Sequence, residues 1–262
     1  MRADRPSVTA RYVAQVRAGL PRPLSSEEGA EAEARLYRVV GRAAPVVLPD
    51  FRRRMAARTA FVDGEVTRAI GHGIAQVVIV GAGYDGRALR FAHPGVSWFE
   101  VDHPATQADK RLRLAQAGVP APAITFVAVD LTTDDLAGAL AAAGFDARSP
   151  ALVVLEGVIG YLPPATTGDL LTTLAGMSVP GSRLVLTVTV ARSGAHPAGR
   201  LRDAVRRTGL ASLGEAPLGT FAPGRIEAVL AASGWRVART EHDCEPGRRH
   251  RVGVLVAAEP AS

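Results

Sequence analysis

The chain has one cysteine, one lysine and no long apolar run. Cys244 alone cannot form an internal disulfide or a multi-cysteine metal site, so the composition fits a reducing compartment. No segment approaches the roughly eighteen consecutive apolar residues of a membrane-spanning helix. The opening residues lack both a continuous apolar segment and a small-residue cleavage site, which argues against an export signal. We therefore expect a cytoplasmic protein with no membrane partner.

Lysine is almost absent although the chain is basic. Lys110 is its only occurrence, while the net charge is +6 and the isoelectric point is near 10.3. The arginines are spread along the chain and form no basic track, which disfavours nucleic acid as a partner. A length of 262 residues suits one α/β domain with its own core.

The sequence also lacks the usual signatures of metal and covalent catalysis. No histidine lies in a metal-ligand spacing such as HExxH, and no serine or cysteine lies in a nucleophile motif. We expect no metal site. The six histidines are His72, His93, His103, His196, His242 and His250.

Apolar periodicity divides the chain into a helical first third and an alternating remainder. Helical spacing marks residues 7–20, 27–40 and 49–70. From residue 76, short β-branched runs at 76–80, 97–101, 124–129, 151–155 and 183–190 alternate with helical stretches. This alternation predicts an α/β fold with a mostly parallel, doubly wound, Rossmann-like sheet. A helix at 224–233 and a strand pair ending with 251–258 predict an antiparallel addition at the C-terminus.

We expect one domain over residues 1–262, with no internal repeat. Its parts would be a helical cap (1–75), a cofactor-binding core (76–190), an acceptor lid (191–223) and a C-terminal helix with an antiparallel strand pair (224–262). The prolines of the first third mark loops between short helices, because proline interrupts helical hydrogen bonding.

A glycine-rich turn follows the first predicted strand. Gly81, Ala82 and Gly83 open the run GAGYDG, where glycines permit a tight turn and close approach by a ligand. Asp102 follows about twenty residues later, at the end of the second strand, where a carboxylate can bind ribose hydroxyls. Taken alone, this pattern fits NAD as well as other adenosine cofactors.

Acidic residues also end the third and fourth predicted strands. These are Asp130, followed by Leu131, and Glu156. Because the carboxyl ends of parallel strands form the ligand crevice, we expect them to converge with Gly81 and Asp102. Asp130 would meet an adenine amino group, and Glu156 would approach the methionine part of a cofactor or the acceptor.

These residues resemble the leucine carboxyl methyltransferase-like family of S-adenosylmethionine-dependent O-methyltransferases, in its bacterial secondary-metabolism type. The resemblance covers roughly residues 7–190. It is carried by ARTAFVD (57–63), QVVIVGAGYDGRALR (76–90), FEVDHPATQADKR (99–111), AVDLTTDD (128–135) and LEGVIGYLPP (155–164).

The resemblance implies a role for each matching residue, with S-adenosyl-L-methionine as the cofactor. Arg58 would hold the cofactor carboxylate through two parallel hydrogen bonds. The glycine loop would pack against the cofactor, Asp102 would bind ribose, and Asp130 with Leu131 would flank adenine. Tyr161 would border the acceptor. The remaining members of the expected cofactor site are Gly81, Ala82, Gly83, Asp85 and Glu156, and Asp85 with Arg87 would stiffen the loop.

Two further candidate residues, Arg17 and His196, lie outside the matching motifs. Arg17 loosely resembles an N-terminal family position over the cofactor, but we expect an ordinary solvent-exposed helix arginine there. His196 lies in the expected lid and is the one histidine that we would test as a base. The lid also holds Arg200, Arg202, Arg206 and Arg207 and shows no motif that identifies a substrate.

The expected reaction is O-methylation of a carboxylate or hydroxyl of a small metabolite, such as a polyketide or another secondary metabolite. A carboxylate needs no general base at neutral pH, whereas a hydroxyl would need one. Two alternatives stay open: an NAD-dependent oxidoreductase, and a catalytically inactive methyltransferase-fold interaction module. With only one lysine, a Tyr-x-x-x-Lys pair is excluded. The oligomeric state is not indicated.

Overall fold

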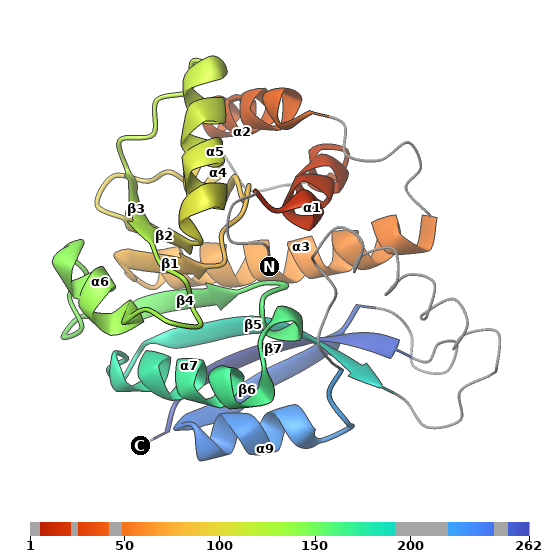
Figure 1. Cartoon of the computed structure of the whole chain (residues 1–262), viewed down its shortest axis with the longest axis vertical. Coiled ribbons are helices and arrows are strands. Elements are labelled where there is room, and N and C mark those ends of the chain that lie inside the picture. The colour runs from red at the N-terminus through yellow and green to blue at the C-terminus, as the bar shows by residue number, and fades with distance from the viewer. Residues whose placement is uncertain (1–5, 22–25, 42–48, 192–219, 244–250, 262) are drawn as a thin grey trace.

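A computed structural model describes residues 6–21, 26–41, 49–191, 220–243 and 251–261 (Figure 1). Its α-helices are α1 (Val8–Ala18), α2 (Glu27–Val40), α3 (Pro49–Gly71), α4 (Arg87–Arg90), α5 (Pro104–Gln116), α6 (Leu136–Ala142), α7 (Pro164–Gly176) and α9 (Arg225–Ala232). The strands are β1 (Gln76–Val80), β2 (Ser97–Asp102), β3 (Ile124–Ala128), β4 (Ala151–Leu155), β5 (Arg183–Ala191), β6 (Trp235–His242) and β7 (Arg251–Pro260), and η1 (Ile159–Tyr161) is a single 3-10 turn.

The strands form one sheet in the order β3-β2-β1-β4-β5-β7-β6. β1 to β5 pair in parallel, whereas β7 runs antiparallel to both β5 and β6. The predicted mostly parallel sheet with an antiparallel C-terminal strand is confirmed. After β3 the chain returns to place β4 beside β1, so the strand order reverses between these two strands. Ligands of open α/β sheets bind outside the carboxyl ends of the strands at such a reversal.

Alternating side chains of each strand build a core on both faces of the sheet. In β1, Val77 and Ile79 join one apolar cluster with residues of α2 and α3, while Val78 and Val80 join another with residues of α6, α7 and α9. This division follows from the two-residue period of a strand. β1 and β4 are buried along their whole length, which explains why their sequences are continuous apolar runs.

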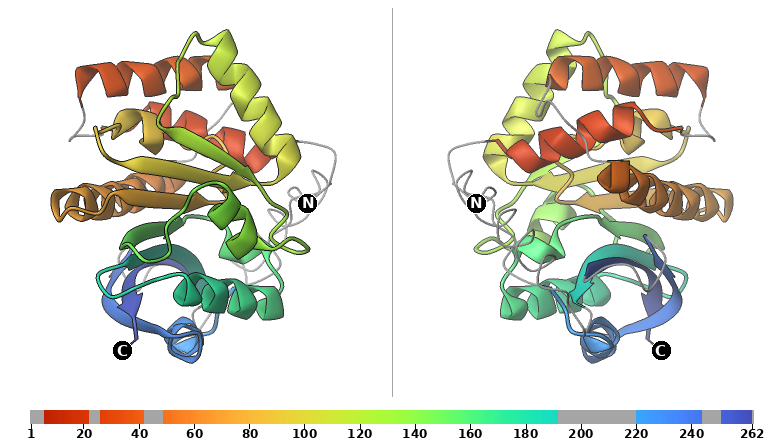
Figure 2. Two further views of the ribbon diagram at one scale, coloured as in Figure 1. Left: turned by 90° about the vertical axis from the view of Figure 1, so that its left-hand side faces the viewer. Right: turned by 90° about the vertical axis from the view of Figure 1, so that its right-hand side faces the viewer.

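The helices begin where the sequence offers a capping side chain. Ser7 caps α1 by accepting from the backbone N–H of Ala10, and Ser26 caps α2 by accepting from Gly29. Pro104 occupies the first turn of α5, where a missing N–H costs nothing. Figures 1 and 2 show α1 and α2 (red) near α5 (yellow-green) at one end of the molecule, with β6, β7 and α9 (blue) at the other.

Sequence periodicity located the helices and strands closely. The two first predicted helices, 7–20 and 27–40, correspond to α1 and α2, and the predicted strands at 76–80 and 151–155 coincide with β1 and β4. No helix in the described ranges is long and apolar enough to span a membrane. Most of the expected lid, with His196 and its four arginines, lies outside the described residues, as does Cys244.

Candidate functional site

The loop between β1 and α4 turns sharply at two glycines. Gly81 and Gly83 have φ of 67° and 53°, the left-handed region that glycine adopts without a Cβ clash. The backbone N–H groups of Gly81 and Ala82 donate to the Val101 carbonyl over 2.8 and 3.0 Å, which fixes the loop on β2. A Cβ at Gly81 would lie 2.3 Å from Cγ2 of Val158, so this position excludes any larger residue.

Asp102 ends β2 beside this loop. Its Oδ2 accepts from the backbone N–H of Gly83, and its Oδ1 accepts from that of His103 over 2.7 Å. Burial raises the pKa of the Asp102 carboxyl, although both hydrogen bonds oppose the shift. Each carboxylate oxygen keeps a further lone pair, because such an oxygen can accept two hydrogen bonds. Asp102 can therefore hold the loop and still accept from a bound hydroxyl.

Asp130 lies across from Asp102 at the end of β3. Its Oδ2 is 3.8 Å from Nε2 of His103, and its Oδ1 accepts from both the hydroxyl and the backbone N–H of Thr132. The hydrogen bonds from Thr132 lower the pKa of Asp130. Leu131 is partly buried against the core. The structure thus brings the acids of β2 and β3 to one edge, as expected.

Glu156, directly after β4, is surrounded by three arginines. Its carboxylate oxygens lie 2.6 Å from Nη2 of Arg17, 2.6 Å from Nη1 of Arg87 and 2.6 Å from Nε of Arg58. Only 3% of the Glu156 side chain is exposed. Since three positive charges meet one buried carboxylate, further acids are needed to balance them.

Asp85 and Asp63 supply that balance. Asp85 Oδ2 lies 2.6 Å from Nη1 of Arg87 and 3.1 Å from Nη1 of Arg17, and Asp63 Oδ1 lies 2.6 Å from Nε of Arg87. We call these six residues the ion-pair cluster: Arg17, Arg58, Arg87, Asp63, Asp85 and Glu156. The cluster ties α1, α3, the glycine loop and the end of β4 together.

The pKa shifts follow from this arrangement. Burial favours the neutral form of Asp85, yet Arg87 and Arg17 lower its pKa to about 2. For Glu156, burial likewise acts upward, but Arg17, Arg87 and Arg58 hold its pKa well below the usual range. Burial lowers the pKa of Arg58, and the neighbouring Arg17 and Arg87 add to that effect against the attraction of Glu156. Both carboxylates therefore stay ionised at neutral pH.

Arg58 uses only part of its guanidinium within the cluster. Its Nε donates to Glu156, and a Cβ at Gly157 would lie 3.7 and 3.9 Å from its two terminal nitrogens. In the part of the chain that the structure describes, neither terminal nitrogen of Arg58 donates a hydrogen bond. A partner carboxylate could accept from both at once.

Arg17 corrects one expectation. The sequence predicted a solvent-exposed helix arginine, but only 5% of Arg17 is exposed, and it bridges Asp85 and Glu156. The packing of α1 against the glycine loop causes this burial: a Cβ at Gly83 would lie 2.8 Å from the Cβ of Ala10. A helical arginine facing a charged crevice cannot be told from a surface arginine by periodicity.

Sequence reasoning also missed Asp63, Glu100 and Lys110. Lys110 donates from Nζ to the Asp85 carbonyl over 2.6 Å and to Oε2 of Glu100 over 2.5 Å. All three lie within the quoted motifs ARTAFVD and FEVDHPATQADKR. The burial of the only lysine in the chain had no signal in the sequence beyond its place in that motif.

Tyr161 and His196 are the residues predicted to border the acceptor. Tyr161 ends η1, half-buried, with its N–H donating to the Val158 carbonyl over 2.9 Å. His196 falls in a segment outside the described residues, so its placement stays a prediction. Over the described ranges, no group of three or more histidine, cysteine or carboxylate side chains is arranged to hold a metal.

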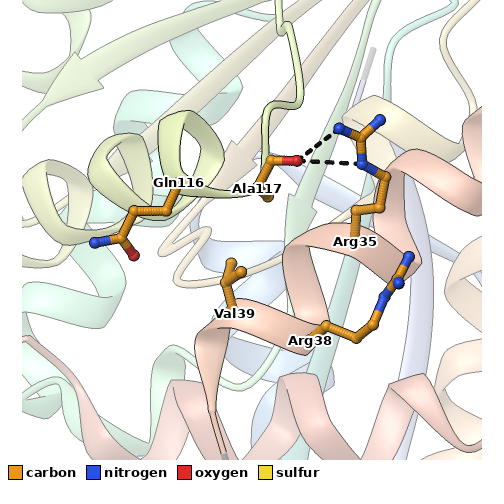
Figure 3. A pocket seen from close by; sticks show the side chains of 5 residues that line it. All are labelled: Arg35, Arg38, Val39, Gln116 and Ala117. Carbon is orange, nitrogen blue, oxygen red and sulfur yellow. Dashed lines mark hydrogen bonds between the residues drawn. The ribbon is translucent and has the colours of Figure 1, made fainter.

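A separate hollow lies between the C-terminal ends of α2 and α5 (Figure 3). It is lined by Arg35, Arg38, Val39, Gln116 and Ala117. Arg35 donates to the Ala117 carbonyl from Nε over 3.1 Å and from Nη2 over 2.7 Å. These contacts cap the last turn of α5, whose carbonyls have no helical partner. None of the five residues belongs to the ion-pair cluster or to the Asp102 region.

Comparison with models of protein families shows which family the chain belongs to. The model of the leucine carboxyl methyltransferase family matches residues 15–175, more than half of the chain. The chain belongs to that family. The match spans Arg17, Arg58, the glycine loop, Asp102, Asp130 and Glu156. S-adenosyl-L-methionine, the cofactor expected from the sequence, is confirmed for this methyltransferase, and the NAD-dependent alternative loses its support.

Relatives of the methyltransferase occur in mycobacteria. A protein of Mycolicibacterium vanbaalenii assigned as an S-adenosyl-L-methionine-dependent methyltransferase is 44% identical over 147 residues, 54% of this chain and 47% of its own. One from Mycobacterium avium with the same assignment is 48% identical over 132 residues, 50% of this chain and 42% of its own. The chain thus matches less than half the length of these relatives.

Solved structures share the fold of the methyltransferase. One from Thermobifida fusca, assigned as a methyltransferase, aligns over 99% of this chain and 96% of its own, with a TM-score of 0.61 and 17% identity. Magnesium protoporphyrin IX methyltransferase of Synechocystis, solved with bound S-adenosylhomocysteine, aligns over 89% of this chain and 95% of its own, with a TM-score of 0.53 and 16% identity. At such identities the likeness concerns the fold alone.

Proposed function

We propose that the protein transfers a methyl group from S-adenosyl-L-methionine to an oxygen atom of a small metabolite. The acceptor would be a carboxylate or a hydroxyl of a polyketide or another secondary metabolite. Two binding features carry the proposal. Asp102 is hydrogen-bonded to Gly83 of the glycine loop, and the terminal nitrogens of Arg58 lie beside Gly157.

The proposed donors would contact the cofactor at both of its ends. Arg58 would grip its carboxylate, Asp102 would accept from the ribose hydroxyls, and Asp130 with Leu131 would flank adenine. The space that a Cβ would take at Gly81 and Gly83 is occupied by Val158 and Ala10, so these glycines permit the tight turn, and Gly81, Ala82 and Gly83 would meet the cofactor through the loop backbone. When bound, the cofactor supplies a methyl group on a positively charged sulfur, a leaving group that needs no further activation. The protein then has to orient the cofactor and the acceptor and to exclude water from the site.

The low pKa values of Glu156 and Asp85 support an acceptor that arrives already ionised. Glu156 and Asp85 are each paired with arginines, and their pKa values lie below the usual range. Carboxylates so stabilised are weak bases, because proton uptake would break two or more ion pairs. A carboxylate acceptor needs no such base. A hydroxyl acceptor would require one, and His196 of the expected lid is the candidate.

The first test is calorimetric titration of the ligand-stripped protein with S-adenosylmethionine, S-adenosylhomocysteine and NAD. We expect the two adenosyl ligands to bind and NAD not to bind. Binding of NAD alone would refute the proposal, and silence from all three would favour an interaction module with this fold.

The second test is methyl transfer from labelled cofactor to matched pairs of small acids and alcohols, using wild type and His196→Ala. We expect methyl esters whose formation does not change with pH above the acid's own pKa and does not depend on His196. Ethers formed only by the wild type would instead assign hydroxyl methylation with His196 as the base. Products methylated on nitrogen or carbon would overturn O-methylation.

A further inference from the structure

The glycine loop is held at two points by side chains of one segment, residues 100–110. At its start, the N–H of Gly83 donates to the carboxylate of Asp102. At its end, the carbonyl of Asp85 accepts from Nζ of Lys110 over 2.6 Å. Asp102 ends β2, and Lys110 lies in the second turn of α5. The β2–α5 unit therefore carries Asp102, the carboxylate expected to bind ribose, and also holds the loop through hydrogen bonds.

Lys110 has no contact with solvent. It is 1% exposed, and its ammonium group also contacts Oε2 of Glu100, which is itself 1% exposed. A buried ammonium without a partner carboxylate would be strongly unfavourable, so Glu100 is what permits a charged lysine at this place. Glu100 contributes nothing further to the loop: its Oε1 has no hydrogen-bond partner in the described part of the chain.

Among the residues that the structure describes, no donor other than Lys110 reaches the Asp85 carbonyl. The N–H of Asp85 donates to the Ala82 carbonyl over 2.8 Å, and its side chain is taken up by Arg17 and Arg87. The backbone orientation of residues 83–85 is therefore set jointly by Asp102, Lys110 and the ion-pair cluster. A shift of this backbone would move both the loop and the Asp102 carboxylate that is hydrogen-bonded to it.

We propose that Lys110 is a positioning residue for the cofactor site, acting through the Asp85 carbonyl, and that Glu100 is its buried counter-charge. Lys110 does not touch the cofactor; it fixes the loop on which the adenosyl group rests. This inference relies on the proposed placement of the cofactor beside Asp102. An uncharged donor could not reproduce the contact, because hydrogen bonds from a charged group are about twice as strong as neutral ones.

The test compares S-adenosylhomocysteine affinity, by calorimetry, with unfolding midpoints in urea for five variants of the full chain. Lys110→Met should weaken binding about 10- to 100-fold, because the ligand would then have to order a loop that has lost a charge-assisted hydrogen bond. Glu100→Gln leaves the Lys110 ammonium without its counter-charge, so it should also weaken binding, by a smaller factor than Lys110→Met. Lys110→Met/Glu100→Gln leaves no buried charge, so it remains testable if the single variant does not fold. It should bind as weakly as Lys110→Met.

Leu114→Ala is the matched control. Leu114 lies one turn further along α5, is 4% exposed and belongs to the apolar core, so its loss destabilises α5 without removing a hydrogen bond to the loop. It should lower the urea midpoint and leave affinity unchanged. The inference is overturned if Leu114→Ala weakens binding as much as Lys110→Met, or if the double variant regains wild-type affinity. Asp102→Ala separates the two proposals: if it binds normally, the cofactor placement itself is wrong.

Discussion

Arg58 donates from Nε to Oε1 of Glu156 over 2.6 Å, joining the long helix α3 to the end of β4. The contact fixes the plane of the guanidinium and leaves its two terminal nitrogens on the side of Gly157. A group held this way before ligand arrives loses little freedom on binding, which favours affinity. The relationship defines the end of the site where we propose the methionine carboxylate to bind.

Replacing Arg58 tests that end directly. Arg58→Met should weaken binding of S-adenosylhomocysteine about 10- to 100-fold, because two charge-assisted hydrogen bonds to a carboxylate are lost. Arg54→Met is the control: it removes a guanidinium one turn earlier in α3, where Arg54 pairs with Asp243 at 2.7 Å. Calorimetry should find wild-type affinity in the control. Equal affinity in both variants would remove Arg58 from the site.

Asp102 is tested by a substitution that preserves shape. Asp102→Asn can still accept one backbone hydrogen bond but lacks the charge that would receive the ribose hydroxyls, so affinity should fall at least about tenfold. Asp146→Asn is matched to it, since Asp146 also accepts from a backbone N–H, that of Arg148 over 3.1 Å, but is 41% exposed. Competition binding with adenosine measures the affinity of both variants. Wild-type affinity in Asp102→Asn would contradict the proposed binding of ribose by Asp102.

Substitutions at Gly81 and Gly73 distinguish the cost of a positive φ from the cost of a steric clash. Gly81→Ala places a Cβ 2.3 Å from Val158 at φ of 67°, whereas Gly73→Ala, at φ of 85°, meets nothing within 4 Å. Gly73→Ala should cost only the conformational term of about 1–2 kcal/mol. Gly81→Ala should cost more and should also weaken cofactor binding. Adding Val158→Ala should recover part of the loss in urea unfolding. No recovery would show that the clash is not the cause.

The buried Glu100 carboxyl should make the free energy of unfolding depend on pH. Burial raises its pKa from 4.5 to about 7, although Lys110 opposes the shift and the charges of Asp85 and Asp102 add to it. The folded state thus binds this proton more tightly than the unfolded state, so stability is greatest below about pH 4.5 as far as this group is concerned and falls as pH rises to about 7. The full change would be about 3 kcal/mol.

Urea unfolding of wild type and Glu100→Gln between pH 5 and pH 8 isolates this group, with pH steps of about one unit. The wild-type free energy of unfolding should fall with rising pH relative to that of the variant, and the difference should level off about one pH unit above the folded pKa of about 7. Parallel curves for the two proteins would show that Glu100 does not titrate in this range.

The sequence by itself determined the fold and the edge where the site lies. Continuous apolar runs predicted β1 and β4, and the alternation with helices predicted a parallel sheet, because these patterns depend only on local periodicity. Asp102, Asp130 and Glu156 each follow a strand, so their meeting at one edge follows from parallel strands. The motif order added the family and with it the cofactor.

Only the tertiary structure decided how the charges are paired. Arg17 lies 68 residues from Asp85, and Arg58 lies 98 residues from Glu156. No period in the sequence links them, and whether a helical arginine meets water or a buried carboxylate depends on how α1 and α3 pack. The same is true of Lys110, whose partner is a backbone carbonyl 25 residues away. Ion pairs in an apolar surrounding are set by packing, and packing is a property of the whole fold.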